Sequence, residues 1–433
     1  MRNIEEYVEI TDRIVRLMKE HGADDCEANI RVQRLEEIQA EARFFNLMRG
    51  MDTESVSMTV LKNGRKGTVS VNTLSEDAVK DAVMKCIVGT EDVRPDPANG
   101  IAEPTENGSF RRGAIEYAPD VFARRMIELA EDISVSHPEL MYDLTGQYIH
   151  EYKLYGNSNG VAFADERGRY DIYASFTATK NGRSASFGPG ANVSTIDPNQ
   201  RYSELGEMNS EMERAERLLD PRPVGDKFVG TLLAMPYAAF NMLRSVQSIA
   251  LSDDEVIDGT SRFGNALGTK VANENLTWSF APHHPDIVLG DMFTAEGYRT
   301  GDFDVIRDGV LKNFCLSRYG AARTGYARAA NPGINAVVKP GTQTVREIIS
   351  KIDRGVILGR YSGNQPTIEG DISGVAKNSF YIENGRIVCP IHETMISGNL
   401  FEMLMNIRAV SADTVKDGNY VLPWIAFDGI TIK

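Results

Sequence analysis

The stretch from residue 140 to residue 180, LMYDLTGQYIHEYKLYGNSNGVAFADERGRYDIYASFTATK, decides the fold. Apolar residues recur at every second position on both sides of a turn at Asn157-Ser158-Asn159-Gly160. This alternation is typical of half-buried strands, whose side chains point to opposite faces in turn. One face of the first half carries Tyr142, Leu144, Gly146, Tyr148 and His150, and one face of the second carries Tyr170, Ile172, Ala174, Phe176 and Ala178. The stretch therefore predicts two long strands joined by a tight turn.

The segment that precedes this stretch shows both the 3.6-residue period of helices and the two-residue period of strands. Apolar residues spaced by 3.6 predict a helix over residues 4–18, which Gly22 ends. Alternation then predicts strands over residues 26–42, with a short break after Val32, and around residues 56–60. Asn63-Gly64 is a strong hairpin signal because both central positions of such a turn need positive φ. Ser75 begins a second helix, which Gly89 ends, so residues 1–100 form an N-terminal α+β domain.

The rest of the chain reads as a central region, 101–222, and a β-rich C-terminal domain, 223–433. Proline and glycine in residues 91–113 indicate a linker, a helix follows from about Pro119, and a polar helix is expected over residues 203–219. Beyond residue 223, hairpins are expected at Asp308-Gly309 and Asn384-Gly385. Short helices are expected at 236–250, 342–353 and 398–409. The fold class is α+β, with an N-terminal helix and antiparallel-sheet domain and a largely antiparallel C-terminal domain with short helices.

The charge balance limits the classes of partner. The 433 residues include 47 Lys and Arg against 61 Asp and Glu, a net charge of −14. Nucleic-acid binders usually carry a basic face that neutralises phosphates, so we expect no nucleic-acid partner. The N-terminus has no apolar signal region, and the longest uncharged stretch, 228–243, is too short to span a membrane. We expect a cytoplasmic protein with no membrane partner.

Histidine and cysteine are scarce, at six and four residues, so metal and nucleophile sites can be enumerated. A helical zinc site needs a second His one turn after a His-Glu pair, and neither His150-Glu151 nor His392-Glu393 has one. His283-His284 lies between two prolines, and adjacent side chains in an extended turn diverge. The four cysteines are dispersed, which is typical of free thiols in a reducing compartment. We therefore expect no metal site and no cofactor in this chain.

Two nucleophile patterns can be drawn from the sequence. Gly156-Asn157-Ser158-Asn159-Gly160 satisfies GxSxG, but it joins two strands where a nucleophile elbow joins a strand to a helix. Cys389, His392 and Glu393 lie close together and are the candidates for a catalytic site. A buried thiol on a strand is the competing interpretation of Cys389.

Several segments, in order, resemble the TldD/PmbA family, whose members have been called modulators of DNA gyrase. The matching segments are Val60–Gly67 with Thr73–Ala78, Asn157–Gly160, Glu296-Gly297 with Ile306–Asn313, Tyr381–Gly385, and Ile396–Leu404. The matches run from about residue 24 to about residue 410, which is most of the chain. The resemblance implies a cytosolic zinc peptidase system that acts on flexible or unfolded peptides, including peptide maturation. The acidic net charge gives no support to direct DNA contact.

The chain departs from the family's zinc-bearing branch at two places. That branch, TldD, carries an HExxxH helix and a later Cys as zinc ligands. The matching segment here, Pro236–Leu251, contains Asn241, Arg244 and Ser245 but no His and no Glu, and no Cys follows Asn406. The resemblance thus places the chain in the PmbA/TldE branch, with zinc expected in a TldD-like partner.

Three interpretations remain open. The chain is a non-zinc subunit that holds an extended peptide beside a TldD-like zinc peptidase, plausibly at an exposed strand edge. It is alternatively a non-catalytic homodimer that binds peptides or has a structural role. A third interpretation is a peptidase that uses Cys389, His392 and Glu393 itself.

Overall fold

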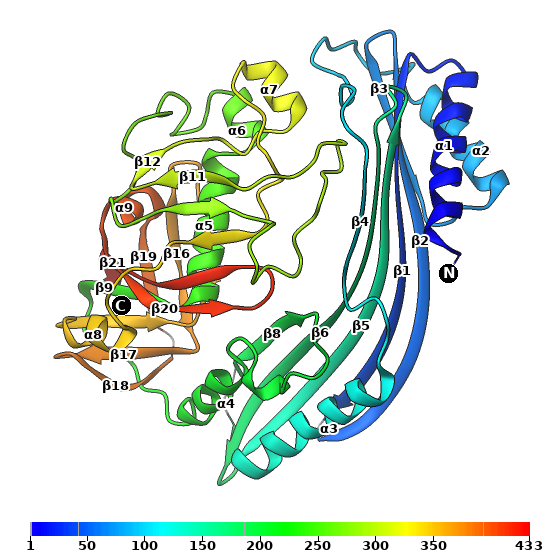
Figure 1. The fold of residues 1–433 in the computed structure, drawn as a ribbon. Helices are drawn as coiled ribbons and strands as arrows, with labels where there is room; N and C mark the ends of the chain where they lie inside the picture. The colour runs from blue at the N-terminus through cyan, green and yellow to red at the C-terminus, as the bar shows by residue number, and fades with distance from the viewer. Residues whose placement is uncertain (1, 42, 185–187, 393) are drawn as a thin grey trace.

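The computed structural model describes residues 2–41, 43–184, 188–392 and 394–433. Within these residues the chain forms two sheets, one of eight strands and one of thirteen, with helices packed on each (Figure 1). Most neighbouring strands are antiparallel, which confirms the expected α+β class. In the described part of the chain, no helix is long and apolar enough to cross a membrane.

The first sheet is built on four very long strands, β1, β2, β5 and β6, which curve together (Figure 1). Its strand order is β3-β2-β1-β5-β6-β4, and β7 and β8 also pair with β6. β1 and β5 pair from Glu27–Asn157 to Ala40–Leu144, so strands from either side of the boundary expected at residue 100 share one sheet. The strands are β1 (Asp25–Glu41), β2 (Phe44–Lys62), β3 (Arg65–Val71), β4 (Gly108–Gly113), β5 (Leu140–Asn157), β6 (Ala162–Lys180), β7 (Arg183–Ser184) and β8 (Gly190–Thr195).

Four helices cover one face of this sheet. They are α1 (Ile4–Glu20), α2 (Glu76–Val88), α3 (Pro119–Ser136) and α4 (Met208–Arg217). Even-numbered residues of the long strands point to this face, where Ile30 and Met58 are buried with α1 and α2, and Tyr170 with Phe122 of α3. The apolar alternation seen in the sequence is the helix-covered side of the sheet.

The second sheet and its helices form the C-terminal half, which lies across the long strands from α1 and α2 (Figure 1). Its core surrounds the fully buried Trp278 and packs against α5. Its strands are β9 (Phe228–Ala234), β10 (Trp278–Phe280), β11 (Phe303–Arg307), β12 (Val310–Leu311), β13 (Ala336–Val338), β14 (Arg354–Leu358), β15 (Arg360–Gly363), β16 (Asp371–Lys377), β17 (Ser379–Glu383), β18 (Arg386–Ile391), β19 (Met395–Asn399), β20 (Ile407–Lys416) and β21 (Val421–Ile432). Its helices are α5 (Pro236–Ala250), α6 (Asp253–Ile257), α7 (Arg318–Thr324), α8 (Val345–Ser350) and α9 (Leu400–Met405).

Short-range signals in the sequence are confirmed at the turns. Asn63 and Gly64 have φ of 51° and 72° between β2 and β3. Asp308-Gly309 joins β11 to β12, and Asn384-Gly385 joins β17 to β18, again with positive φ at both residues. The helix expected at 236–250 is α5.

Three expectations are wrong. β1 runs through the break expected after Val32, because pairing with β2 and β5 on both sides holds the polar residues in the ladder. The segment expected to be a linker contains β4, which pairs in parallel with β6. The helix expected at 203–219 is divided into a short 3-10 helix, Tyr202–Glu204, and α4, with Gly206 at φ 55° between them.

We predict that Gly168→Ala destabilises the first sheet. A Cβ at Gly168 would lie 1.8 Å from the Ala114 carbonyl oxygen, so β4 would be pushed off β6. The melting temperature should fall by ~5 °C or more, the effect of a loss of about 2 kcal/mol. Gly301→Ala is the control, since its Cβ would meet its nearest neighbour at 3.6 Å. Equal melting temperatures of the two variants would contradict the close approach of β4 and β6.

Candidate functional site

The second face of the long sheet is charged and faces the C-terminal half. Odd-numbered residues of β5 and β6 point to it, and the segment after residue 290 docks there. Asp291 accepts hydrogen bonds from Lys153 at 2.6 Å and from Arg167 at 3.0 Å, and Phe293 stacks on Phe163 with ring centroids 5.2 Å apart. These contacts fix the two halves of the chain against each other.

Glu151 is the central charge of this face and is fully buried. Arg167 donates to it at 2.6 Å, Arg31 donates to it from β1, and Arg169 Nη1 lies 3.8 Å away. Burial raises the pKa of Glu151, but the charges of Arg167, Lys153, Arg31 and Arg169 outweigh burial and hold its pKa at about 2. The carboxylate therefore stays ionised, and it organises the arginines around it.

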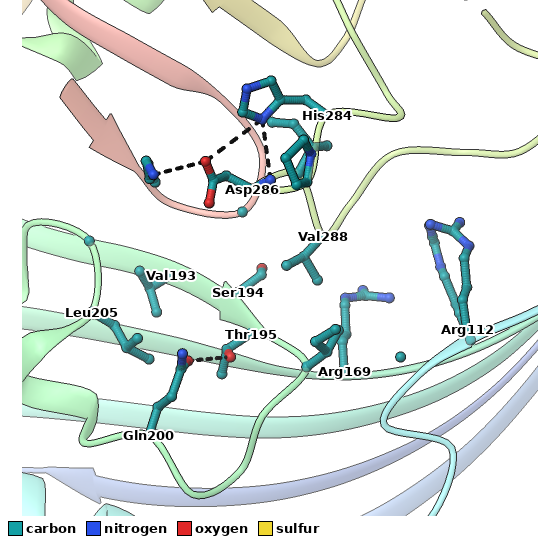
Figure 2. A pocket seen from close by; sticks show the side chains of 18 of the residues that line it. Arg112, Arg169, Val193, Ser194, Thr195, Gln200, Leu205, His284, Asp286 and Val288 are labelled. Atoms are coloured by element: carbon teal, nitrogen blue, oxygen red, sulfur yellow. Dashed lines mark hydrogen bonds and ion pairs between the residues drawn. The ribbon is translucent and has the colours of Figure 1, made fainter.

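Of three neighbouring cavities, the largest, about 790 Å³, lies between this face and the C-terminal half (Figure 2). Arg112 of β4 and Arg169 of β6 lie on the sheet side, and the segment around His284 and Asp286 lies on the opposite side. The Lys416 ammonium group forms an ion pair with the Asp286 carboxylate at 2.9 Å. Apolar side chains, among them Val193, Leu205 and Val288, line the cavity together with polar ones such as Ser194, Thr195 and Gln200.

A second cavity, about 320 Å³, adjoins the first along β8. Arg214 lies between Glu207, at 3.3 Å, and Glu211, at 3.1 Å. Burial raises the pKa of Glu211 above its usual range. The charge of Arg214 lowers this pKa, but the neighbouring carboxylate of Glu207 raises it again. Burial also raises the pKa of Asp417 to about 6, although Asn419 and Tyr420 each donate a backbone N–H to it at 2.8 Å.

A third cavity, about 460 Å³, lies between α5 and β15. α5 contributes polar side chains, and three consecutive residues of β15, Tyr361 to Gly363, line the other side. A strand offers consecutive residues to a cavity through its edge, not through a face. β15 pairs with β16, and among the described strands it has no other neighbour, so its second edge faces this cavity. The helix residues are Asn241, Arg244, Ser245 and Ser248.

These α5 residues do not fit a zinc ion. Structural and catalytic zinc sites use Cys, His and carboxylate ligands, whereas this helix offers an amide, a guanidinium and two hydroxyl groups. Arg244 Nη1 is also committed to the Gly333 carbonyl oxygen at 3.3 Å. Across the described residues, no group of three or more His, Cys, Asp or Glu side chains is arranged to hold a metal ion.

The candidates from the sequence lie elsewhere. Cys389 on β18 is opposite Tyr381 of β17 and packs on the C-terminal core; burial raises the pKa of its thiol. His392 donates its backbone N–H to the Arg222 carbonyl oxygen at 3.4 Å. Glu393 lies outside the described residues, so this three-residue site stays a prediction.

The two adjacent histidines have separate partners. His283 Nε2 lies 3.0 Å from Thr300 Oγ1, whereas His284 Nδ1 accepts the backbone N–H of Asp286 at 3.2 Å. Both line the largest cavity.

Sequence reasoning missed all three cavities, because each draws on segments far apart in the chain. The largest combines β4, β6 and β8 with residues 282–288 and 414–418. The sequence did contain one signal, the charged residues at the odd positions 165–171 of β6. This signal was ambiguous, because a solvent-exposed face and a buried ionic face produce the same alternation of charged residues.

Comparison with known proteins agrees with this architecture. Residues 230–433 match the family model of the PmbA/TldA metallopeptidase C-terminal domain. A metalloprotease PmbA homolog of Haemophilus influenzae is 24% identical over 88% of this chain and 85% of its own length. Metalloprotease PmbA of Escherichia coli O157:H7 is 24% identical over 87% of this chain and 86% of its own length.

Solved structures share the whole fold. The crystal structure of TldE from Thermococcus kodakarensis has a TM-score of 0.84 at 20% identity and covers 98% of this chain and 99% of its own. A putative modulator of DNA gyrase from Bacteroides thetaiotaomicron has a TM-score of 0.85 at 19% identity, over 99% of both chains. The fold and the sequence matches define a relative of the PmbA-type metallopeptidases. The family-model match over residues 230–433, the PmbA homologues and the TldE structure support the TldD/PmbA family, which the sequence resemblance predicted.

We predict that Asp417 makes the stability of the protein depend on pH. Its folded-state pKa, about 6, lies above its ordinary value of 3.8. The contribution of this group to stability is therefore full below about pH 4 and is lost as pH rises through about 6. Between pH 4 and pH 7 the free energy of unfolding of Asp417→Asn should fall less than that of the wild type. The difference between the two proteins should reach up to about 3 kcal/mol.

Melting temperatures of both proteins at pH 4.5 and pH 7.5 measure this difference. The exposed Asp92→Asn is the control and should follow the wild type at both values. If the gap between Asp417→Asn and the wild type is the same at both pH values, the carboxyl group is not desolvated as described.

Proposed function

We propose that this chain is a PmbA/TldE-type subunit of a cytoplasmic peptidase system that acts on unfolded peptides. In this proposal a TldD-like partner carries the zinc and activates the water, and this chain holds the extended peptide. Its similarity to metalloprotease PmbA and to TldE supports the assignment. The α5 residues support the division of labour, because their donor set does not suit zinc.

The open edge of β15 carries the proposal. Its unpaired N–H and C=O groups can pair with an extended peptide that lies in the cavity beside α5, which is β-strand addition. Backbone pairing of this kind accepts many sequences, because it uses groups that every residue has. An unfolded segment offers those groups, whereas a folded protein keeps them paired internally.

A second candidate, a non-catalytic homodimer, is favoured by β2. β3 pairs with residues 56–62 of β2, and among the described strands nothing else pairs with that side of residues 44–55. Phe44 and Met48, each 74% exposed, lie on this stretch. Long apolar strand edges commonly pair with another chain.

The first prediction concerns zinc and cleavage. The purified chain alone should hold no stoichiometric zinc and should not cleave an unfolded peptide such as reduced, carboxymethylated lactalbumin. Mixed with a TldD-like protein that contains HExxxH, it should increase cleavage above the rate of the partner alone. Metal analysis, gel filtration and fragment mass spectrometry measure these quantities. Stoichiometric zinc with cleavage by the chain alone contradicts the proposal, and no gain on mixing with a stable self-dimer favours the second candidate.

The second prediction concerns the cavity beside α5. Ser245→Trp should fill this cavity and remove most of the gain in cleavage on mixing, while the complex still forms, because the peptide can no longer reach the edge of β15. Ser210→Trp, an exposed serine on α4, is the matched control and should keep the gain. A full gain with Ser245→Trp would rule out β15 as the peptide-binding edge.

A further inference from the structure

The largest cavity has a charge balance opposite to that of the chain. Its charged lining residues are four basic and two acidic, although the whole protein has a net charge of −14. Carboxylates that pair with the arginines, such as Asp165 and Asp171, are buried beneath the lining and are not part of it. The cavity therefore presents guanidinium groups to whatever enters it. The charged lining residues are Arg112, Arg167, Arg169, Lys416, Glu204 and Asp286.

Arg169 is the residue whose hydrogen bonding is incomplete. It is 8% exposed, and its Nε donates to both carboxylate oxygens of Asp171 at 3.1 and 2.9 Å. Its Nη1 is buried and has no hydrogen-bond partner in the described residues; Glu151 lies 3.8 Å away, beyond hydrogen-bond distance. This Nη1 is enclosed, and Arg169 lines the cavity with a single carboxylate, that of Asp171, hydrogen-bonded to its guanidinium group.

Arg112 extends the same surface. Arg112 of β4 is opposite Arg167 of β6, so both share the cavity face with Arg169, two residues further along β6. Arg112 is held by Asp165 at 3.2 and 2.8 Å and keeps a quarter of its side chain exposed. The planar guanidinium group matches a carboxylate in geometry and charge. Val193 and Leu205 on the sheet side and Val288 on the opposite side add apolar surface to the cavity.

We propose that this cavity binds a peptide carboxylate, with Arg169 and Arg112 as its donors and an apolar side chain of the same peptide against Val193, Leu205 or Val288. This inference rests on the proposed function for the nature of the ligand, a peptide. The carboxylate can come from the C-terminus of the peptide or from an Asp or Glu side chain. The cavities adjoin through β8 and residues 359–366, so one extended chain can occupy β15 and this cavity together.

Binding to the purified full-length chain tests the inference without partner or cleavage. The probes are fluorescent acetyl-Lys-Ala-Leu-Leu with a free carboxylate, its C-terminal amide, and an amidated acetyl-Lys-Ala-Glu-Leu, followed by anisotropy. The free-acid peptide should bind at least about tenfold more tightly than its amide, the effect of one charge-assisted pair. Tight binding of the amidated glutamate peptide assigns the site to side-chain carboxylates, and tight binding of the free acid alone assigns it to the C-terminus.

Two variants identify the cavity. Arg169→Lys keeps the charge beside Glu151 and Asp171 but removes the planar donor, and it should weaken binding of the carboxylate peptides by about tenfold and leave the amide unchanged. Val288→Trp fills the cavity without disturbing an ion pair and should weaken binding of the carboxylate peptides. Val229→Trp, on the exposed face of β9, is its control and should leave binding unchanged.

Equal affinity for all three peptides, no binding by any probe, or unchanged binding in both Arg169→Lys and Val288→Trp would overturn the inference. Carboxylate-dependent binding by a chain that gives no gain on mixing with a zinc subunit would leave the cavity assigned and reject the proposed function alone.

Discussion

The ionised Glu151 and the arginines around it constrain the rest of the structure. A fully buried carboxylate is costly unless several donors surround it, and here Arg31 and Arg167 from neighbouring strands donate to it. Removing one partner would leave an uncompensated buried charge, so this register of β1, β5 and β6 is strongly preferred over a shift by one residue. The same face binds the C-terminal half through Asp291. One ionic layer therefore sets both the strand register and the relation between the two halves.

This layer also explains why the cavities lie where they do. An apolar second face would have packed densely against the C-terminal half, whereas a charged face touches it through a few ion pairs and leaves space beside them. The cavities run from the arginine-lined cleft along β8 to the open edge of β15. In the proposed function these surfaces hold an extended chain, and water is activated elsewhere, because α5 has no suitable zinc ligands.

Local chemistry was predictable from the sequence and long-range assembly was not. Asn63-Gly64, Asp308-Gly309 and Asn384-Gly385 fixed their hairpins because positive φ is a property of the residues themselves. β4 was missed because its partner β6 lies more than fifty residues away in the sequence and its glycines resemble a linker. The pairing of Arg169 with Asp171 and Glu151 was hidden for the same reason: alternating charges on β6 equally predict a solvent-exposed face. The family resemblance indicated that the zinc ligands of the TldD branch are missing from this chain. The residue patterns alone gave no reason to look for ligands at those positions.

Amide hydrogen exchange on the purified chain, with and without an unfolded peptide and with no partner present, tests the central claim most directly. The account predicts that the peptide slows exchange in residues 360–366, at the open edge of β15, and leaves residues 65–71 of the edge strand β3 unchanged. Backbone pairing at β15 produces that pattern, because the edge of β15 lines the cavity beside α5, whereas no residue of β3 lines it. Unchanged exchange at 360–366, or equal slowing at β3, would contradict the account.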